Sequence, residues 1–270
     1  MKKVLALLLV LSMVVLALAA CGNATDTGKE TKGEETKTEE SKGEETKDAE
    51  TTDSSVMTHA QYVAAELDTA VVVVTYVQAK QSWWDNKATV YAQSEDGAYF
   101  LYNMACSEAD YAKLTPGTKI KVSGYKSAWS GEVEITDATF EILEGSYIAE
   151  PTDVTALLGK DELIDHQNEY VAFKALQVVA SKVDGDDTEH AFLYKWDNSG
   201  TPGDDLYFKV TDGENVYQFT VESYLCGKDT DVYKAVEGLT VGDTIDMTGF
   251  LYWYNGVNPH ITSVTDTPTE

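Results

Sequence analysis

The sequence predicts a mainly β protein: two tandem five-stranded Greek-key barrels, each with short helices, that follow an export segment and a disordered tether. Three observations predict this organisation: an apolar N-terminal run that ends at a cysteine, a low-complexity stretch of Lys, Glu and Thr, and an internal repeat in the rest of the chain. We therefore divide the 270 residues into segments 1–20, 21–58, 59–150 and 151–270. An apolar content of 43% is enough for a hydrophobic core in each barrel.

The N-terminal segment is typical of a secretory signal peptide, with Lys2 and Lys3 before an apolar run. The run ends in Leu-Ala-Ala-Cys at residues 18–21, where small side chains allow a peptidase to approach and the Cys21 thiol can carry a diacylglyceride. This segment resembles the lipobox of bacterial lipoproteins. The resemblance implies cleavage before Cys21, lipidation of Cys21, and anchoring to the outer face of the cytoplasmic membrane in the bacterial cell envelope. A plain transmembrane anchor is the alternative, but it gives no reason for a cysteine at this position.

Residues 22–58 contain few apolar side chains, and the hexapeptide KGEETK at 32–37 returns at 42–47. A segment of this composition cannot offset the entropy cost of ordering itself. We expect a flexible tether that, as a coil, holds the folded part about 35 Å from the lipid on average. A helix built from Glu–Lys pairs is the alternative, and the Gly and Thr residues argue against it.

An internal repeat follows the tether. The run LTPGTKIKVSGY at 114–125 matches LTVGDTIDMTGF at 239–250, so that equivalent residues are 125 positions apart. The same spacing relates Trp129 to Tyr254, and Cys106 and Cys226 precede the two runs at similar positions. Matches in this order indicate a duplicated unit.

Each repeat shows the same order of strand and helix signals. In the first repeat we expect strands at 70–79, 88–93, 98–105, 118–125 and 132–143, with a helix at 108–114. In the second we expect strands at 170–183, 206–211, 216–222, 244–252 and 260–264, with a helix at 232–236. A further helix is expected at the start of each repeat, at 60–67 after the cap residue Thr58 and at 161–167.

The order of three strands, a helix and two strands is that of an OB-fold. Each repeat therefore resembles an OB-fold domain, and the whole chain is similar to lipid-anchored tandem OB-fold proteins of bacterial surfaces, a functionally uncharacterised group. The resemblance brings no catalytic motif with it. A β-sandwich of immunoglobulin type is the structural alternative, although a helix between the third and fourth strands is hard to place there.

An OB barrel binds its ligand on strands two and three and through the loops that join strands one to two and four to five. All five Trp fall in or beside these loops, where a flat ring can stack on a sugar or a base. The expected ligand-binding residues are Trp83, Trp84, Trp129, Tyr194, Trp196, Trp253 and Tyr254. The alternative is that these rings close the barrel ends as core. Because Trp83 and Trp84 cannot both face one way in an extended segment, we expect at least one to be exposed or ligand-bound.

The charge of the chain bears on its ligand. With 46 acidic residues, 20 Lys and no Arg, the net charge is −26. Nucleic acid needs a positive groove and is best held by Arg, so we expect it to be an unlikely partner. A local basic patch nevertheless leaves single-stranded nucleic acid, or an anionic wall polymer, as an alternative for the first barrel. The patch consists of Lys80, Lys87, Lys119, Lys121 and Lys126, and the alternative is that these lysines only solubilise the surface.

These observations predict a non-catalytic binding protein at the cell surface. We expect its ligand to be a saccharide or a wall polymer held by the aromatic loops. The alternative is a protein partner in the envelope, for which the chain would act as an accessory module of a membrane complex.

Motifs for catalysis or metal binding are missing from the sequence. The four His are scattered, and we find neither a nucleophile elbow nor a phosphate-binding loop. An enzyme that uses a carboxylate pair remains the alternative, because such a pair is defined by separation in space. No cofactor is expected, apart from weak calcium candidates at Asp184, Asp186 and Asp187, where Asp-Gly is also ordinary turn chemistry. Cys106 and Cys226 are expected to be buried free thiols.

Overall fold

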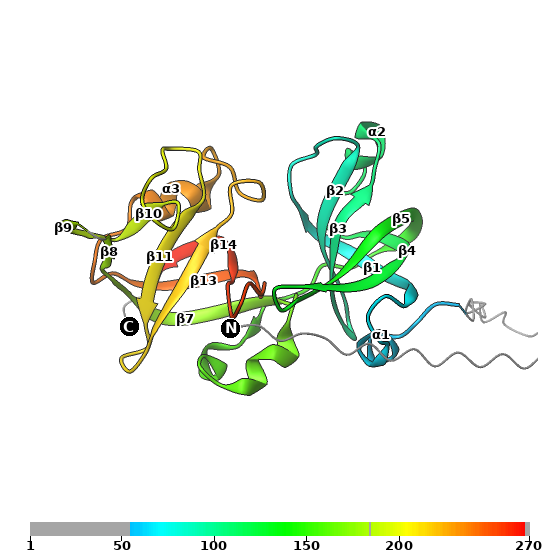
Figure 1. Cartoon of the computed structure of the whole chain (residues 1–270), viewed down its shortest axis with the longest axis horizontal. Coiled ribbons are helices and arrows are strands. Elements are labelled where there is room, and N and C mark those ends of the chain that lie inside the picture. Colours follow the sequence, from blue (N-terminus) through cyan, green and yellow to red (C-terminus); the bar gives the residue numbers. More distant parts are fainter. Residues whose placement is uncertain (1–54, 184, 268–270) are drawn as a thin grey trace, which may run out of the picture. The chain divides into compact units, whose positions relative to one another are not determined.

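The structure, a computed structural model, describes residues 55–183 and 185–267, which belong to one compact unit. Figure 1 follows the chain through its strands and helices by colour. The predicted signal peptide, the predicted lipidation residue Cys21 and the tether as far as residue 54 lie outside the described residues.

The first repeat forms a closed barrel with the strand order β1-β2-β3-β5-β4 (Figure 1). Neighbouring strands are antiparallel except for β3 and β5, which run parallel, and α2 lies between β3 and β4 in the chain. This is the topology of an OB-fold. Its elements are α1 (His59–Ala64), β1 (Ala70–Lys80), β2 (Lys87–Ser94), β3 (Gly97–Ala105), α2 (Glu108–Tyr111), β4 (Thr118–Trp129) and β5 (Glu132–Ser146).

The second repeat builds the same ring in the order β7-β11-β12-β14-β13, which a pairing between β11 and β7 closes. Here β12 and β14 run parallel, and α3 lies between β12 and β13 in the chain. The ring elements are β7 (Tyr170–Val179), β11 (Leu206–Thr211), β12 (Val216–Val221), α3 (Asp231–Glu237), β13 (Thr244–Phe250) and β14 (His260–Asp266). The additional elements are β6 (Thr152–Asp153), the 3₁₀ helices η1 (Thr155–Leu157) and η2 (Asp161–His166), β8 (Ser181–Val183), β9 (Asp186–His190) and β10 (Phe192–Tyr194).

The predicted fold class, mainly β with two OB-like rings, is confirmed. Several predicted elements differ in their bounds, and two of them differ in kind or in pairing as well. The strand expected at 170–183 ends at Val179, because β11 and β13 offer no partner beyond that residue and Ser181–Val183 pair with β9 instead. The helix expected at 161–167 is the 3₁₀ helix η2. The expected cap of α1 is present, since the Thr58 side chain accepts from the N–H of Gln61.

The repeated sequence motif makes the same backbone hydrogen bond in both barrels. Gly117 and Gly242 precede β4 and β13 with φ of +89° and +104°, a conformation that glycine adopts without strain. Gly117 donates its N–H to the carbonyl of Val77 at 2.7 Å, and Gly242 donates to that of Val178 at 2.9 Å. The motif thus fixes where the fourth strand of each barrel starts against the first.

Each barrel has its own hydrophobic core, and a third apolar cluster joins the two. In this cluster Tyr91 and Phe100, on β2 and β3 of the first barrel, pack with Phe250 of the second, and none of the three is more than 3% exposed. Burial of an aromatic side chain of this size contributes about 1.5–3 kcal/mol. The Tyr91 hydroxyl also pairs with Nδ1 of the buried His260 at 2.6 Å. Part of the face on which OB-folds bind ligands is therefore covered by the second barrel.

Candidate functional site

The five tryptophans fall into two groups by exposure. Trp84 and Trp196 are each 72% exposed and Trp129 is 55% exposed, whereas Trp83 and Trp253 are half-buried. An indole that faces solvent adds little to a core, so the first three rings are available to a ligand.

Trp83 and Trp84 face different surroundings, as their positions in an extended segment require. The Trp83 indole N–H donates to the backbone oxygen of Cys106 at 3.0 Å and so ties the β1–β2 loop to the end of β3. Trp84 begins a tight turn that two backbone hydrogen bonds with Lys87 close, and the two residues between them have positive φ. The loop therefore uses Trp83 as an internal support and leaves Trp84 in solvent.

Trp129 and Tyr254 form a ring pair with centroids 5.1 Å apart and planes inclined by 34°. Trp129 ends β4 at the hairpin of the first barrel, and Tyr254 lies in the β13–β14 loop of the second. The backbone N–H of Asn255 donates to the carbonyl of Ser130 at 2.6 Å, which joins the two loops directly beside the rings. Both rings stay accessible, since Trp129 is 55% and Tyr254 is 49% exposed.

Trp253 supports this pair from within. Its ring packs against the core of the second barrel and against Gly131, where an added Cβ would lie 2.8 Å from the indole. The hairpin of the first barrel can approach Trp253 only because residue 131 lacks a side chain. Trp253 is thus part of the packing between the barrels, not an open platform.

Further tyrosines extend this surface. Tyr102, 44% exposed on β3, stacks at 6.3 Å on Phe100, which meets Tyr252 edge-on at 5.2 Å. Tyr207 on β11 is close enough to Tyr254 for the two phenols to interact electrostatically, as Tyr252 does with Tyr102. We call the accessible and half-buried rings together the aromatic seam: Tyr102, Trp129, Tyr207, Tyr252 and Tyr254.

Carboxylates border the aromatic seam. Burial, followed by the charge of Asp205, raises the pKa of Glu222 to about 7, and burial raises the pKa of Glu134 on β5. Burial raises the pKa of Tyr252, and the charges of Glu134 and Glu222 act on it as well. Glu134 is only 6% exposed whereas Glu222 is partly exposed, so Glu222 is the one of these two acids that can accept hydrogen bonds from a ligand beside the rings.

Sequence reasoning found only part of this surface. It singled out Trp129 and Tyr254, but it missed Tyr207, Glu134 and Glu222. Their strands alternate as expected, but no pattern within one repeat shows which outward side chains the other repeat will meet.

Two predicted ligand-binding residues of the second barrel lie in its long loop. The Tyr194 hydroxyl donates to Glu237 of α3 at 2.6 Å, and its ring packs against the core. Trp196 is exposed and, within the described part of the chain, stacks on no other ring. The structure therefore pairs Trp129 with Tyr254 and leaves Trp84 and Trp196 as single exposed rings.

The lysines predicted as a basic patch have different surroundings. Lys126 is only 7% exposed and donates to three backbone carbonyls at the end of α1. The Lys80 ammonium donates to the backbone oxygen of Tyr111 and lies 3.7 Å from the centroid of its ring. Lys87 is exposed and Lys121 is partly exposed on β4. The fold thus uses at least Lys80 and Lys126 for its own contacts.

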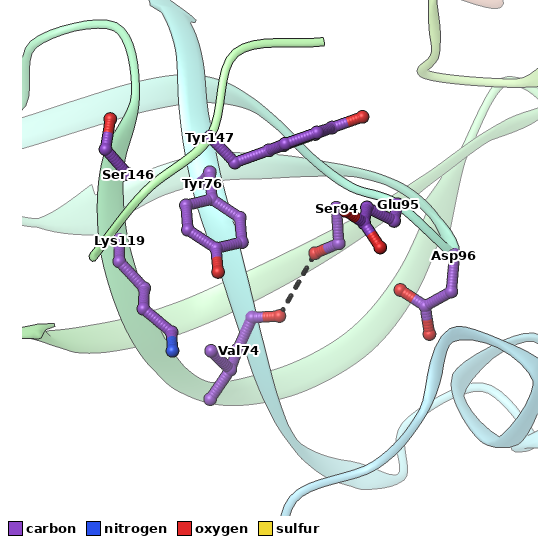
Figure 2. A pocket seen from close by; sticks show the side chains of 8 residues that line it. All are labelled: Val74, Tyr76, Ser94, Glu95, Asp96, Lys119, Ser146 and Tyr147. Carbon is purple, nitrogen blue, oxygen red and sulfur yellow. Dashed lines mark hydrogen bonds between the residues drawn. The ribbon is translucent and has the colours of Figure 1, made fainter. Parts of the chain in front are cut away.

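A groove of about 440 Å³ opens on the first barrel (Figure 2). The rings of Tyr76 and Tyr147 meet edge to face in it, with centroids 5.4 Å apart. Lys119 extends beside Tyr76, with Nζ 5.8 Å from the ring centroid, while Glu95 and Asp96 lie across the groove (Figure 2). A cation of the chain itself already lies in this groove, and we assign no ligand to it.

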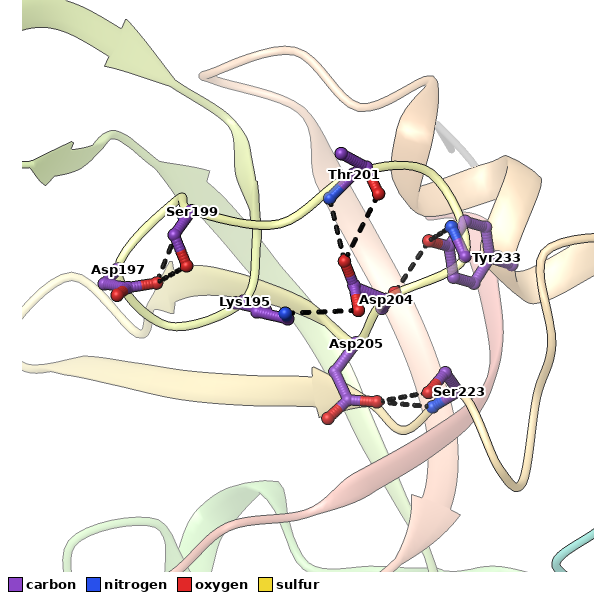
Figure 3. Close-up of polar contacts among 9 residues, drawn as sticks. Lys195, Asp197, Ser199, Thr201, Asp204, Asp205, Ser223 and Tyr233 are labelled. Atoms are coloured by element: carbon purple, nitrogen blue, oxygen red, sulfur yellow. Dashed lines mark hydrogen bonds and ion pairs between the residues drawn. The ribbon is translucent and has the colours of Figure 1, made fainter.

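The acidic loop of the second barrel uses its carboxylates to hold turns (Figure 3). Asp197 accepts from the N–H and hydroxyl of Ser199 at 3.1 and 2.7 Å, and Asp205 accepts from those of Ser223 at 2.8 and 2.6 Å. Asp204 likewise accepts from Thr201 and Lys195 (Figure 3). In residues 55–183 and 185–267 no three metal-ligating side chains of His, Cys, Asp or Glu come together. Of the calcium candidates, Asp184 lies outside the described residues, so that prediction stays open.

Cys106 and Cys226 are free and buried, as predicted. Burial, followed by the charge of Glu222, raises the pKa of Cys226 to about 12, and burial raises that of Cys106. A raised pKa favours the protonated form of both thiols, which is the less nucleophilic form.

Comparisons with known proteins give no family assignment: no family model matches, and no curated protein matches. Among solved structures, a murine DNA-binding protein bound to double-stranded DNA is 12% identical and covers 74% of this chain and 97% of its own, with a TM-score of 0.35. The HINa domain of Ifi202 with a 20-base-pair DNA is 14% identical, with 74% and 100% covered and a TM-score of 0.33. The HIN1 domain of p202 with a 12-mer DNA is 13% identical, with 74% and 92% covered and a TM-score of 0.31.

All three of these structures hold double-stranded DNA. This finding contradicts the expectation that nucleic acid is an unlikely partner, which had rested on net charge and the missing Arg. We withdraw that expectation and count DNA among the ligands to be measured.

Within the described residues, no helix has the length and apolar character needed to cross a bilayer.

Proposed function

We propose that this protein is a non-catalytic binding protein that recognises a saccharide at the aromatic seam. The observation that carries the proposal is the Trp129–Tyr254 ring pair, to which each barrel contributes one ring and in which both rings are about half exposed. Large rings that pack against each other and still face solvent are costly to leave bare and favourable to cover.

The chemistry of the seam suits a polyhydroxylated ligand. The C–H face of a sugar ring stacks on indole and phenol rings, and its hydroxyl groups donate to carboxylates and phenols. Glu222 supplies a carboxylate, and Tyr102, Tyr207 and Tyr252 supply the phenols. Stacking gives affinity, and the directed hydrogen bonds give preference for one arrangement of hydroxyl groups.

We also propose that the protein acts at the outer face of a bacterial membrane, anchored by a diacylglyceride on Cys21. The support for this proposal is the Leu-Ala-Ala-Cys segment after an apolar run and the Lys/Glu/Thr-rich stretch that follows it. Expression with a labelled fatty acid tests it. The label enters wild-type protein in the membrane fraction, and Cys21→Ala protein carries none; label on the variant contradicts lipidation at this residue.

A glycan array probed with the full-length protein tests the saccharide proposal. We expect retention of a neutral oligosaccharide that changes little between low and high salt, because an uncharged ligand forms no ion pair that salt could screen. The same preparation is titrated with single-stranded and double-stranded DNA. Binding of DNA with a steep loss of affinity on added salt, and no retained glycan, would identify a nucleic-acid-binding protein instead.

A matched pair of variants tests where on the protein the saccharide binds. The double variant W129A/Y254A removes the ring pair, and Trp196→Ala removes an equally exposed indole outside the seam. Glycan retention by the Trp196 variant and loss by the double variant would assign binding to the seam. The reverse result would move the site to the long loop of the second barrel.

A further inference from the structure

Glu132 lies at the joint between the barrels. It is the first residue of β5, next to the hairpin that carries Trp129, and it is fully buried at 0% exposure. A carboxyl group in such a place must be neutralised or fully hydrogen-bonded, because desolvation disfavours its charged form.

The hydrogen bonds of this carboxyl are incomplete. Oε2 accepts from the backbone N–H of Trp253 at 2.9 Å and from the side-chain amide of Gln167 at 3.3 Å. Oε1 is buried and has no hydrogen-bond partner among the described residues. Half of the group is thus held by the second barrel, and the other half is unpaired.

A second unpaired oxygen belongs to Asn168, which is 4% exposed. Its side-chain NH₂ donates to the carbonyl of Val133 at 3.0 Å, and its backbone N–H donates to the carbonyl of Leu251 at 2.9 Å. Its Oδ1 has no partner in the described part of the chain. The Asn168 side-chain amide is a neighbour of the Glu132 carboxyl and lowers its pKa as a hydrogen-bond donor to the charged form.

Both of these buried oxygens are acceptors and neither can satisfy the other, whereas a proton on the Glu132 carboxyl would supply the missing donor. A protonated carboxyl is a donor, and an amide oxygen is a good acceptor for it. Burial, the largest cause, raises the pKa of Glu132 to about 8, against the hydrogen bonds from Trp253, Asn168 and Gln167, which lower it.

The titratable groups around Glu132 do not favour its charged form. Glu134 on the same strand raises its pKa. From the other elements, Tyr62 of α1, Tyr91 of β2 and Tyr252 beside β13 interact electrostatically with it, and the pKa of each phenol is itself raised.

We propose that Glu132 is a neutral carboxylic acid in the folded protein and donates its O–H to Oδ1 of Asn168, as a latch between the barrels. Loss of this proton to solvent leaves two acceptors and a negative charge in a dry joint, which loosens the loop that positions Tyr254. The latch concerns the joint itself and needs no ligand, so its test is independent of the saccharide proposal.

The linkage has a definite sign. An unfolded Glu loses its proton near pH 4.3, whereas the folded protein holds the Glu132 proton until about pH 8. Folding therefore becomes less favourable as the pH rises between these values, by a factor of up to about ten in the folding equilibrium constant for each pH unit. Above the folded pKa the loss levels off.

The variant Glu132→Gln tests the latch, since its amide keeps the shape, accepts from Trp253 and donates permanently to Asn168. Urea unfolding of the full-length protein is measured from pH 5 to pH 9 for wild type and the variant. We expect the wild type to lose stability relative to Glu132→Gln as the pH rises to about 8, and the control Glu141→Gln, an exposed acid on the same strand, to stay parallel to wild type. Parallel curves for wild type and Glu132→Gln would overturn the proposal.

A second measurement covers the case in which the variant does not fold. The wild-type protein is labelled with ¹³C in the glutamate carboxyl groups, and its NMR signals are followed with pH. Glu134→Gln and Glu222→Gln assign the neighbouring raised acids. We expect a remaining carboxyl signal that titrates near pH 8, and its absence would contradict a neutral Glu132.

Discussion

The rings of Trp129 and Tyr254 lie 5.1 Å apart, although the two residues are 125 positions apart in sequence. They occupy equivalent positions of the repeat, so the duplicated unit touches itself at corresponding loops. In each copy this loop joins the fourth and fifth strands of the barrel, one of the places where OB-folds bind ligands. The duplication has thus brought two ligand loops to one surface.

Lys126 should be a stability residue and not a ligand residue. Its ammonium donates to the carbonyls of Tyr62, Val63 and Ala65 at the end of α1, at 3.0, 2.8 and 2.7 Å. The Tyr62 carbonyl also accepts from the N–H of Ala65 at 3.2 Å. Lys126→Met is expected to lower the free energy of unfolding by about 2 kcal/mol, measured by urea denaturation. The control Lys113→Met, which breaks an exposed pair, should change it by less than about 0.5 kcal/mol. Equal effects would contradict the assigned role.

Gly249 should tolerate no side chain. A Cβ there would lie 2.3 Å from the carbonyl oxygen of His260 and 2.7 Å from Cα of Ile261, both backbone atoms of the paired strand β14. Gly249→Ala must therefore open the β13–β14 pairing, and we expect a loss of more than about 3 kcal/mol or failure to fold. At Gly242 nothing lies within 4 Å of an added Cβ, and only positive φ opposes it. Gly242→Ala should cost about 1 kcal/mol, as measured by thermal unfolding.

His260 should stay neutral in mild acid. Burial lowers its pKa to about 3, and its Nδ1 pairs with the Tyr91 hydroxyl. An unfolded His binds a proton below about pH 6.5. The unfolded state then holds a proton that the folded state lacks, so stability falls as the pH drops from 6.5 towards 3, by up to about 1.4 kcal/mol per pH unit.

An NMR titration of the imidazole C–H signals checks this expectation. The signal of His260, assigned with His260→Gln, should not move between pH 4.5 and pH 8. A titration midpoint near pH 6.5 would contradict burial of this ring between the barrels.

The architecture could be predicted from the sequence because the local strand patterns and the internal repeat both indicated two OB-like barrels. The twelve-residue match at 114–125 and 239–250 contains Gly117 and Gly242, which precede the fourth strand of each barrel, and Gly124 and Gly249, which lie within it. The spacing of the match therefore reflects the structure. On the third strand, Tyr99 is 1% and Tyr102 is 44% exposed, as expected for side chains three positions apart that point to opposite faces.

The candidate site was only partly predictable, because it depends on how the two barrels meet. Loop position alone marked Trp84 and Trp196, which are exposed, and Trp83 and Trp253, which the fold uses for support. Nothing in the pattern of β5 separates Glu132 from an ordinary solvent-facing acid of an alternating strand. Glu132 is buried by the loop that carries Trp253, more than a hundred residues later in the chain. The periodicity within one repeat cannot predict that contact.

A fluorescence titration of the full-length protein with an oligosaccharide retained on the array tests the central claim most directly. Loss of the ring pair in W129A/Y254A should weaken binding at least tenfold, since stacking on an aromatic ring is worth about 1–3 kcal/mol. Both rings are half exposed, so the free energy of unfolding should change by less than about 1 kcal/mol. Unchanged affinity in a folded double variant, or a large loss of stability in it, would contradict a saccharide site at the aromatic seam.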